Sequence, residues 1–316
     1  MLVSRLCLGT FNFGTVTDDK EAFRIMDAAL DEGINFFDTA NHYPDFVNCG
    51  RTEQYIGRWL AQGNGRREKT IIATKVYQPM EDPFDGPNNA PGLSAYKIRR
   101  HIEGSLTRLQ TDHIELYQMH HIDRRVSWEE VWEAFDRLQK QGKIDYVGSS
   151  NFAAWHLTLA QAAAREKHML GLVSEQHRYN LDCRLPELEV LPSALAQGIG
   201  ILPYHPFAGG LLAGDLANPP KGSRRESLTD EYGRRKKTLH AYTDLCREMG
   251  ESEPTIAVAW LLAQPAVTSV IVGPRTVDQL ESITRAVEAK LDDEVLSRLD
   301  ELFPGPGGAA PEAYSW

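Results

Sequence analysis

Short apolar runs alternate with amphipathic stretches about eight times along the 316-residue chain. The runs have the length of buried strands, and the stretches between them space their apolar positions as one face of a helix does. The strands predicted in this way are residues 5–9, 34–38, 70–75, 114–119, 146–150, 172–176, 198–204 and 267–273. Strands that alternate with helices predict a parallel sheet with right-handed crossovers.

Several helix ends carry clear signals. Ser127 and Glu130 have the spacing of a capping box ahead of a predicted helix that Gly142 ends. Ser94 can cap the helix that begins at residue 95, and Pro254 can occupy the first turn of another. Eight β/α units in a chain of this length predict an α/β fold, the closed (β/α)8 or TIM barrel.

A doubly wound dinucleotide fold is the competing architecture. It requires G-x-G-x-x-G directly after the first strand. The chain has LGTFNFG at residues 8–14, which lacks that spacing. The barrel is therefore favoured, and any nucleotide must bind without a Rossmann loop. We expect residues 1–316 to form a single barrel domain, because no linker-like segment divides the chain.

Three segments interrupt the alternation of strands and helices. They are Gln78–Leu93, His205–Asp230 and the tail Pro304–Trp316. We expect them around the barrel mouth or across its side, where long loops usually shape a substrate pocket.

Composition narrows the class of protein. Hydrophobic residues make up 42% and charged residues 25%, which is typical of a globular domain. The net charge of −10 and the absence of a long basic run argue against nucleic-acid or anionic-membrane partners. No apolar stretch approaches the ~18 residues of a membrane span. The first ten residues, MLVSRLCLGT, do not have the pattern of a secretory signal.

The cysteines indicate a reducing compartment. Cys7, Cys49, Cys183 and Cys246 form no CxxC pair, and no Cys/His cluster has the spacing of zinc ligands. The sequence therefore predicts reduced thiols, no metal site and a cytoplasmic location.

Four polar residues follow the apolar runs. Asp38 and Lys75 are the last residues of predicted strands, His120 directly follows one, and Tyr43 lies in the loop after Asp38. The carboxyl ends of barrel strands share one face, so we expect these side chains to meet there. A nearby ammonium lowers the pKa of a phenol, and a carboxylate keeps the ammonium charged. The next residue, His121, is expected to face away, because adjacent strand residues point to opposite sides.

These positions carry a family resemblance. The segments DTANHY, ATK and LYQMH resemble the catalytic segments of the aldo-keto reductases. VGSSNF, SEQHRYN, LPYHPFAGGLL and IVGPRTVDQLES follow that family's order and spacing, from about Leu6 to about Phe303. The resemblance implies NADPH-dependent reduction of a carbonyl. Tyr43 would donate the proton, Lys75 and Asp38 would support it, and His120 would orient the carbonyl oxygen.

The same resemblance implies a set of cofactor-binding residues. Ser149, Asn151 and Gln176 would surround the nicotinamide carboxamide, and Tyr204 would stack on the ring. His205 departs from the family pattern, which has Ser there. Arg275 at a helix start would hold the 2′-phosphate of NADPH, which favours NADPH over NADH. The remaining positions at the phosphate and adenosine ends are Gly210, Leu211, Gly273, Gln279 and Ser282, the last in place of a usual Asn.

Two further features concern the barrel itself. Related reductases begin with a β-hairpin that plugs the barrel bottom, whereas here the first barrel strand is predicted almost at Met1. We therefore expect the plug to be absent or curtailed, and closure of the bottom by side chains or by a partner subunit stays open. Glu53, in the helix start after the Tyr43 loop, is expected to brace that loop rather than to take part in catalysis.

The substrate is indicated by a narrower resemblance. MHHIDR, GRTEQYIGRW, SLTRLQTDHIELYQ and the tail FPGPGGAAPEAYSW resemble reductases of actinomycete deoxysugar pathways, some of which support antibiotic biosynthesis. It implies a nucleotide-linked keto-deoxysugar, reduced by a keto or 2,3-enoyl reductase. The diphosphate would be contacted by Arg124 and Arg125, or by Arg224–Arg225. Two alternative functions stay open. One is a general aldehyde or ketone reductase, and the other is a regulatory subunit of a membrane channel that binds NADPH and turns over slowly. Assembly into a homo-oligomer also stays open.

Overall fold

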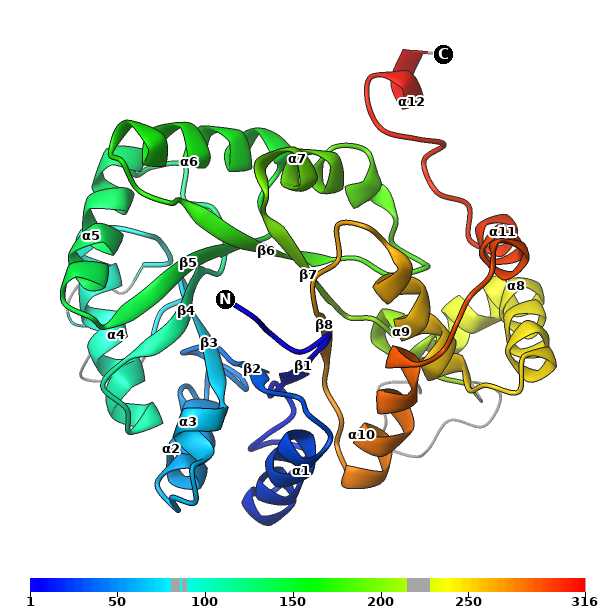
Figure 1. The fold of residues 1–316 in the computed structure, drawn as a ribbon, viewed down its shortest axis with the longest axis horizontal. Helices are drawn as coiled ribbons and strands as arrows, with labels where there is room; N and C mark the ends of the chain where they lie inside the picture. The colour runs from blue at the N-terminus through cyan, green and yellow to red at the C-terminus, as the bar shows by residue number, and fades with distance from the viewer. Residues whose placement is uncertain (81–85, 87–89, 215–227, 316) are drawn as a thin grey trace.

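The computed structural model describes residues 1–80, 86, 90–214 and 228–315. Eight parallel strands form one sheet in the order β7-β6-β5-β4-β3-β2-β1-β8, ringed by helices (Figure 1). The strands are β1 (Leu6–Gly9), β2 (Phe36–Asp38), β3 (Ile71–Val76), β4 (Ile114–Met119), β5 (Ile144–Ser150), β6 (Leu172–Arg178), β7 (Gly200–Tyr204) and β8 (Val270–Val272). Each predicted strand is confirmed, with ends shifted by a few residues.

The two ends of the sheet meet, so the barrel closes. The amide of Ile201 in β7 donates to the carbonyl oxygen of Ala266 at 3.0 Å, and the amide of Thr268 donates to the Ile201 carbonyl at 2.9 Å. The segment just before β8 therefore pairs with β7, while β8 itself pairs with β1. The predicted (β/α)8 barrel is confirmed.

The helices lie outside the strands in chain order (Figure 1). They are α1 (Asp19–Asp31), α2 (Arg51–Leu60), α3 (Arg66–Lys69), α4 (Ala95–Leu109), α5 (Trp128–Lys140), α6 (Ala154–Glu166), α7 (Val190–Gln197), α8 (Thr229–Glu248), α9 (Glu253–Ala263), α10 (Val277–Thr284), α11 (Asp293–Leu302) and α12 (Glu312–Ser315). Within the described ranges, none of them combines the length and the apolar character needed to cross a bilayer.

The predicted helix caps are formed, with one difference. Ser94 accepts the Lys97 amide at the start of α4, and Ser127 accepts the Glu130 amide at the start of α5. The carboxylate of Glu130 does not return to Ser127 as a full capping box would require. It accepts the Ala95 amide instead, at 2.9 Å, and so links α5 to α4.

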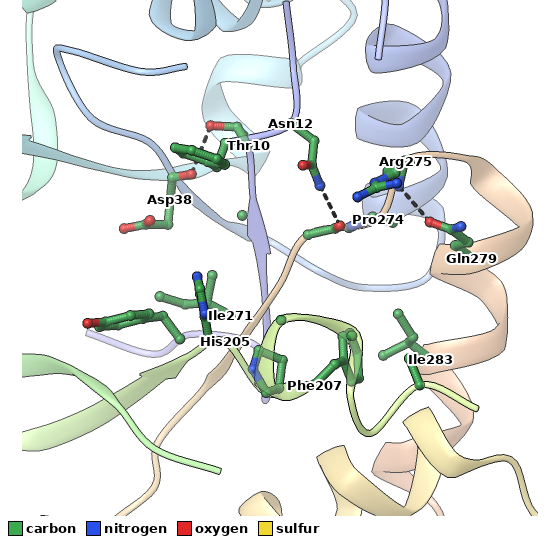
Figure 2. Close-up of a pocket in the computed structure, with 18 of the residues that line it drawn as sticks. Thr10, Asn12, Asp38, His205, Phe207, Ile271, Pro274, Arg275, Gln279 and Ile283 are labelled. Carbon is green, nitrogen blue, oxygen red and sulfur yellow. Dashed lines mark hydrogen bonds between the residues drawn. The ribbon is translucent and has the colours of Figure 1, made fainter. Parts of the chain in front are cut away.

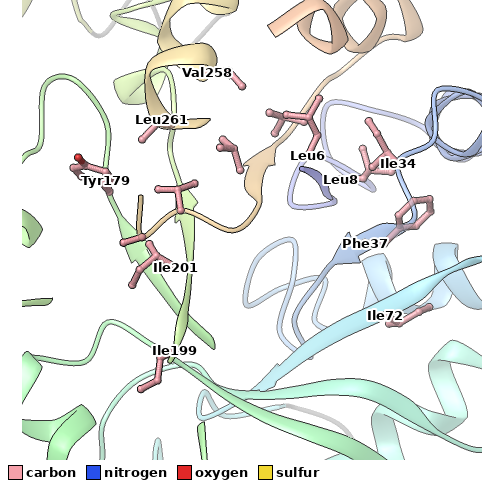
Figure 3. Close-up of a cluster of buried hydrophobic side chains, with 14 of the residues drawn as sticks. Leu6, Leu8, Ile34, Phe37, Ile72, Tyr179, Ile199, Ile201, Val258 and Leu261 are labelled. Carbon is pink, nitrogen blue, oxygen red and sulfur yellow. The ribbon is translucent and has the colours of Figure 1, made fainter. Parts of the chain in front are cut away.

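The apolar side chains form two layers on opposite faces of the strands. The larger layer, between strands and helices, includes Leu6, Leu8, Ile72 and Ile201 (Figure 3). The smaller layer fills the barrel with Cys7, Phe36, Ala73, Leu116, Leu202 and Ile271. Successive strand residues face opposite sides, so the next inward position after each of these lies two residues on. For Phe36, Ala73 and Leu116, that position is Asp38, Lys75 and Gln118.

The barrel bottom is covered without a hairpin. Residues 1–5 precede β1 and contain no strand, and Figure 1 shows this segment running toward the centre of the ring. Val3 packs against the inner apolar layer. Ser4 and Asn35 exchange two hydrogen bonds, of 2.9 and 3.1 Å. Residues 1–5 form no hairpin, and they lie at this end of the barrel with Val3 against the inner apolar layer.

The three irregular segments are described in part. Residues 81–85 and 87–89 of the first, 215–227 of the second and Trp316 of the tail lie outside the described residues. The rest of the tail runs along the segment that joins β6 to α7. Ala310 donates its amide to the Leu188 carbonyl at 2.8 Å, and the Tyr314 hydroxyl donates to Glu189 at 3.1 Å. This tail therefore crosses the side of the barrel.

Candidate active site

A cavity of about 690 Å³ opens at the carboxyl ends of the strands (Figure 2). Asp38, Tyr43 and His120 line one part of it, as expected from their places after β2 and β4. Its other walls come from the loops after β1, β7 and β8 and from α10. Residues of the predicted catalytic segments and of the predicted cofactor-binding segments therefore line one continuous cavity.

Lys75 and Asp38 form a buried ion pair below the cavity floor. Lys75 Nζ lies 2.6 Å from Asp38 Oδ2, and it also donates to the Thr39 carbonyl at 2.8 Å. Burial disfavours the ammonium, but the charges of Asp38 and Tyr43 outweigh it and raise the pKa of Lys75. Lys75 is therefore positively charged at neutral pH, as the sequence predicts.

Two amides hold the other oxygen of Asp38. Gln118 Nε2 donates to Asp38 Oδ1 at 3.0 Å, and Gln176 Nε2 donates to it at 2.8 Å. Gln118 was not predicted, although it shares the inward face of β4 with His120. Gln176 lines the cavity as expected, but its amide donor is already engaged with the carboxylate. The carboxylate is thus fixed from three sides.

Tyr43 lies above this pair. Lys75 Nζ is 5.0 Å from the centre of its ring. The prediction that Lys75 brings the pKa of Tyr43 toward neutrality is wrong in its net direction. Burial raises the pKa more than the charge of Lys75 lowers it, so the pKa of the phenol lies above its usual value. The phenol therefore keeps its proton at neutral pH, as a proton donor must.

The loop that carries Tyr43 is braced by a buried network. Thr52 donates its amide to the Tyr43 carbonyl at 3.4 Å. Next to it, the fully buried Glu53 accepts from Arg108 Nε at 2.7 Å and from the Thr74 hydroxyl at 2.6 Å. Glu53 therefore links α2 to β3 and α4, which agrees with its expected supporting role.

His120 stands next to Tyr43 in an aromatic cluster. Its ring centre is 5.7 Å from that of Tyr43 and 4.9 Å from that of His42. Burial and the charge of Lys75 lower the pKa of His120 well below its usual value. Nδ1 of this ring is buried, and it has no hydrogen-bond partner within the described part of the chain. The ring is therefore neutral, and a neutral imidazole carries one N–H that can donate to a carbonyl oxygen.

His42 was not predicted. It stacks on Phe46 with ring centres 5.5 Å apart. Burial and the Lys75 charge lower its pKa to about 4. Sequence gave it no signal beyond its place beside Tyr43, because its partner His120 is distant along the chain.

The predicted nicotinamide contacts lie together at one side of the cavity. Asn151, Gln176 and Tyr204 all line it. The Tyr204 hydroxyl donates to Asn151 Oδ1 at 2.7 Å, and Asn151 Nδ2 donates to the His120 carbonyl at 3.3 Å. Asn151 has a positive φ of 60°, a left-handed conformation that Asn adopts more readily than most residues. These bonds join the expected cofactor side to the catalytic side.

Ser149 does not face the cavity. Its hydroxyl is fully buried and donates to Glu175 at 2.5 Å, on the helix side of β5. Ser150 lines the cavity instead, and its hydroxyl accepts from Asn151 Nδ2 at 3.0 Å. The correction follows from strand alternation, because Ser150 shares the inward face of β5 with Tyr146.

The glycine-rich loop after β7 borders the cavity. Gly210 lines it with a φ of 115°, which favours glycine and leaves the backbone bare at that wall. Leu211 does not reach it, because its side chain is 4% exposed and belongs to the apolar core. His205 lines the cavity, with its ring edge-on to Tyr204 at a centre distance of 5.4 Å. Gly210 therefore lies at the cavity wall and the Leu211 side chain does not, and the contact of either residue with phosphate stays a prediction.

The residues Gly273, Arg275, Gln279 and Ser282 all line the cavity. Figure 2 shows Arg275 and Gln279 together at its far end. The Arg275 amide donates to Gln279 Oε1 at 2.9 Å, and the Ser282 hydroxyl donates to the Gln279 carbonyl at 2.8 Å. Among the residues with described side chains, no carboxylate pairs with the Arg275 guanidinium. The Arg275 guanidinium, which has no carboxylate partner among these residues, can therefore bind an anion at this end of the cavity.

The loop after β1 adds two residues that sequence reasoning missed. Phe11 meets Tyr43 edge-on with ring centres 5.0 Å apart, and Asn12 Nδ2 donates to the Gly273 carbonyl at 2.8 Å. Both lie in LGTFNFG, a segment whose only sequence signal is that it lacks the spacing of a Rossmann motif.

Arg124 and Arg125, two of the basic residues expected at a diphosphate, do not line the main cavity. Arg125 pairs with Asp123 at 2.9 Å, and the Arg124 guanidinium lies 6.0 Å from the Trp155 ring centre. Arg224–Arg225 lie outside the described residues.

The chain resembles known proteins along most of its length. Residues 5–303 match the model of the aldo/keto reductase family. The chain is 58% identical to the uncharacterized oxidoreductase YrpG of Bacillus subtilis, over 99% of this chain and 96% of that protein. It is 29% identical to versiconal hemiacetal acetate reductase of Aspergillus parasiticus, over 95% and 94%. It is 31% identical to a probable voltage-gated potassium channel subunit beta of Oryza sativa subsp. japonica, over 95% and 93%.

Proposed function

Because the chain belongs to the aldo/keto reductase family and is an oxidoreductase that reduces carbonyl compounds, we propose that it uses NADPH as its reductant and Tyr43 as its proton donor. One observation carries the proposal. The phenol of Tyr43, the Lys75–Asp38 pair and the neutral ring of His120 converge at the floor of a single cavity of about 690 Å³. The cavity is large enough for a small-molecule carbonyl substrate beside a cofactor.

The residues divide the chemistry of carbonyl reduction. The reduced nicotinamide, when bound, supplies the hydride that reaches the carbonyl carbon. Tyr43 gives its proton to the carbonyl oxygen, and the charged Lys75 stabilises the phenolate that is left. His120 donates a hydrogen bond to the same oxygen and so orients the substrate and stabilises the charge that develops on it. Asp38, fixed by Gln118 and Gln176, keeps Lys75 charged and in place.

The cofactor fits the donors that line the cavity. Asn151 and Ser150 offer an amide and a hydroxyl for the carboxamide, Tyr204 offers an aromatic face, and Gly210 offers bare backbone for phosphate. Arg275 at the far end supports NADPH over NADH, because its guanidinium can bind a 2′-phosphate as a bidentate partner.

For the substrate, we propose a nucleotide-linked keto-deoxysugar, supported by the segments and tail that resemble deoxysugar-pathway reductases of antibiotic-producing actinomycetes. A general aldehyde or ketone reductase is the alternative, since a relative is named for reducing versiconal hemiacetal acetate. The name of the rice relative supports a second alternative, a channel-associated subunit with slow turnover. The same proposal includes a single barrel domain and a cytoplasmic location, the latter because none of the four cysteines forms a disulfide.

The test measures oxidation of NADPH and NADH with three substrates: an aromatic aldehyde, a dicarbonyl and a nucleotide-linked 4-keto-6-deoxyhexose. Turnover confined to the nucleotide sugar, with NADPH preferred, is the expected result. Fast turnover of the simple carbonyls alone would favour the general reductase. NADPH binding without turnover of any of these substrates or of a wider carbonyl panel would favour the regulatory subunit, and equal use of NADH would contradict the cofactor assignment.

A further inference from the structure

The His42 ring contacts both side chains that meet the carbonyl oxygen in the proposed reaction. Its centre is 5.0 Å from that of Tyr43 and 4.9 Å from that of His120, and the rings of Tyr43 and His120 are 5.7 Å apart. The three rings therefore form a closed triangle in which each contacts the other two. His42 makes two of these three contacts, although the proposed reaction gives it no part.

Hydrogen bonds hold the backbone of His120 but not its ring. The His120 amide donates to the Val76 carbonyl at 2.9 Å, and the His120 carbonyl accepts from Asn151 Nδ2 at 3.3 Å. Nδ1 of the ring is buried and finds no hydrogen-bond partner among the described residues. Because Nδ1 is buried, Nε2 is the nitrogen that can reach a carbonyl oxygen in the cavity. The orientation of Nε2 therefore depends on the side chains that pack against the ring.

His42 is itself anchored by its neighbours. The amide of the preceding residue, Asn41, donates to the Lys75 carbonyl in β3 at 3.4 Å, and Asn41 Nδ2 lies 2.8 Å from His101 Nδ1 in α4. Phe46, which is 56% exposed, stacks on the His42 ring with centres 5.5 Å apart. The ring against which His120 packs is therefore held through its backbone and by a second ring.

The contact between His42 and His120 is one of packing rather than of hydrogen bonding. Nδ1 of His42 is also buried, and within the described part of the chain it has no hydrogen-bond partner. Burial and the charge of Lys75 lower the pKa of His42 to about 4 and that of His120 well below its usual value, so neither ring is charged at neutral pH. The two rings meet at a tilt of 45°. A ring of similar size without nitrogen should therefore replace His42, whereas a small amide should not.

We propose that His42 is a positioning residue of the reductase, whose ring holds the His120 imidazole in the orientation that turns Nε2 toward the carbonyl oxygen. The consequence for catalysis rests on the proposed function, in which His120 orients that oxygen. A shift of about 1 Å in such a group lowers a rate by up to about 100-fold, so this contact is expected to affect kcat. The placement of the ring requires no turnover and can be measured without a substrate.

The first experiment measures the placement of the His120 ring by NMR, with the full chain labelled at its histidine and tyrosine rings. A nuclear Overhauser contact between the His120 and Tyr43 rings, whose centres are 5.7 Å apart, is expected in the unchanged protein and in His42→Phe. His42→Ala and His42→Asn should weaken or lose this contact, and circular dichroism shows that each variant is folded. The proposal is overturned if the unchanged protein lacks the contact, or if a folded His42→Ala or His42→Asn keeps it at full strength.

The second experiment follows NADPH oxidation with the nucleotide-linked 4-keto-6-deoxyhexose, or with 4-nitrobenzaldehyde if only simple carbonyls are reduced. His42→Ala is expected to lower kcat about tenfold or more with little change in KM or NADPH affinity, because a contact that matters in the transition state is lost. His42→Phe should restore kcat to within about threefold of the unchanged protein, and His42→Asn should not. His240→Ala removes an exposed imidazole on α8 and should change neither kcat nor KM. Restoration by Asn and not by Phe would contradict a role in packing.

A double-mutant cycle tests whether His42 acts through His120. In a His120→Ala background, His42→Ala should lower kcat no further, because no imidazole is left to position. The same loss in both backgrounds would overturn the positioning role. If His120→Ala alone leaves kcat unchanged, the proposed function is wrong about His120, and the ring contact measured by NMR still decides whether His42 holds that ring.

Discussion

Lys75 Nζ lies 2.6 Å from Asp38 Oδ2, and the two side chains are only 0% and 4% exposed. Such a pair is costly to break, because removal of one partner leaves the other charge buried without its counterion. Asp38 would still accept from Gln118 and Gln176, but these donors are neutral amides. The relation between Lys75 and Asp38 therefore supports both the fold of the barrel mouth and the charge beside Tyr43.

Lys75→Met is expected to lower the free energy of unfolding by about 3–5 kcal/mol and to abolish carbonyl reduction. The double variant Lys75→Met/Asp38→Asn should recover most of the stability, because no unpaired charge remains, but none of the activity. Chemical denaturation of the two variants tests the first part, and NADPH oxidation tests the second. A double variant no more stable than Lys75→Met would show that the charge of Asp38 is not the cause.

Tyr43→Phe is expected to lower kcat by at least ~100-fold, because the general acid is removed. NADPH affinity should stay close to that of the unchanged protein, since the ring and its contacts with Phe11 and His120 are kept. Tyr55→Phe, on α2 and outside the cavity, is the matched control and should retain activity. Stopped-flow turnover and fluorescence titration of NADPH measure the two quantities. Lost NADPH binding in Tyr43→Phe would contradict the assigned role.

Acid sensitivity follows from His42. Its pKa of about 4 in the folded protein compares with about 6.5 in an unfolded chain. Between these values the unfolded chain binds a proton that the folded protein does not, so stability falls as the pH drops below about 6.5. The loss from His42 approaches about 3 kcal/mol near pH 4. His120 acts in the same direction.

The His42→Phe variant isolates this effect. It keeps a ring against Phe46 and His120 but has no proton to gain. Its stability should therefore fall less steeply with acid than that of the unchanged protein, while the two are similar near neutral pH. Denaturant unfolding at a series of pH values measures the slopes. Equal slopes would mean that His42 is not the group that takes up the proton.

Arg275→Ala tests the cofactor preference. NADPH affinity should fall about 10- to 100-fold, because a charge-assisted contact with the 2′-phosphate is lost, and NADH affinity should change little. Arg285→Ala removes an exposed arginine just after α10, which pairs with Glu251, and serves as the control. Fluorescence titrations with both cofactors give the comparison. Similar losses for NADPH and NADH would place the 2′-phosphate elsewhere.

Local patterns predicted the barrel because each strand and helix cap is a short-range signal. Ser94 and Pro254 act within one turn of their own helix, and the structure has them where the sequence puts them. The approach of Tyr43, Lys75, Asp38 and His120 was also predictable, since strand ends share one face of a barrel. Quantities that depend on several segments at once were not predictable in this way. The pKa of Tyr43 is one, because burial in the folded structure outweighs the nearby charge of Lys75.

The β5 strand illustrates the same limit at a single residue. Family resemblance alone selected Ser149 for the cofactor, but the inward face of β5 runs through Tyr146 and Ser150. An alternation argument from residue 146 would have found Ser150 without a structure. The hydrogen bond from Ser149 to Glu175 was beyond such an argument, since it depends on the pairing of β5 with β6.

These two neighbouring serines provide a paired prediction. Ser150→Ala should weaken NADPH binding several-fold with little change in stability, because its hydroxyl faces the cavity beside Asn151. Ser149→Ala should leave NADPH binding unchanged and lower the free energy of unfolding by about 1–3 kcal/mol, because the buried Glu175 loses a donor. Titration of NADPH and chemical denaturation of both variants separate the roles. If Ser149→Ala weakened NADPH more than Ser150→Ala did, the inward face of β5 would be wrongly assigned, because the two changes remove the same hydroxyl one residue apart.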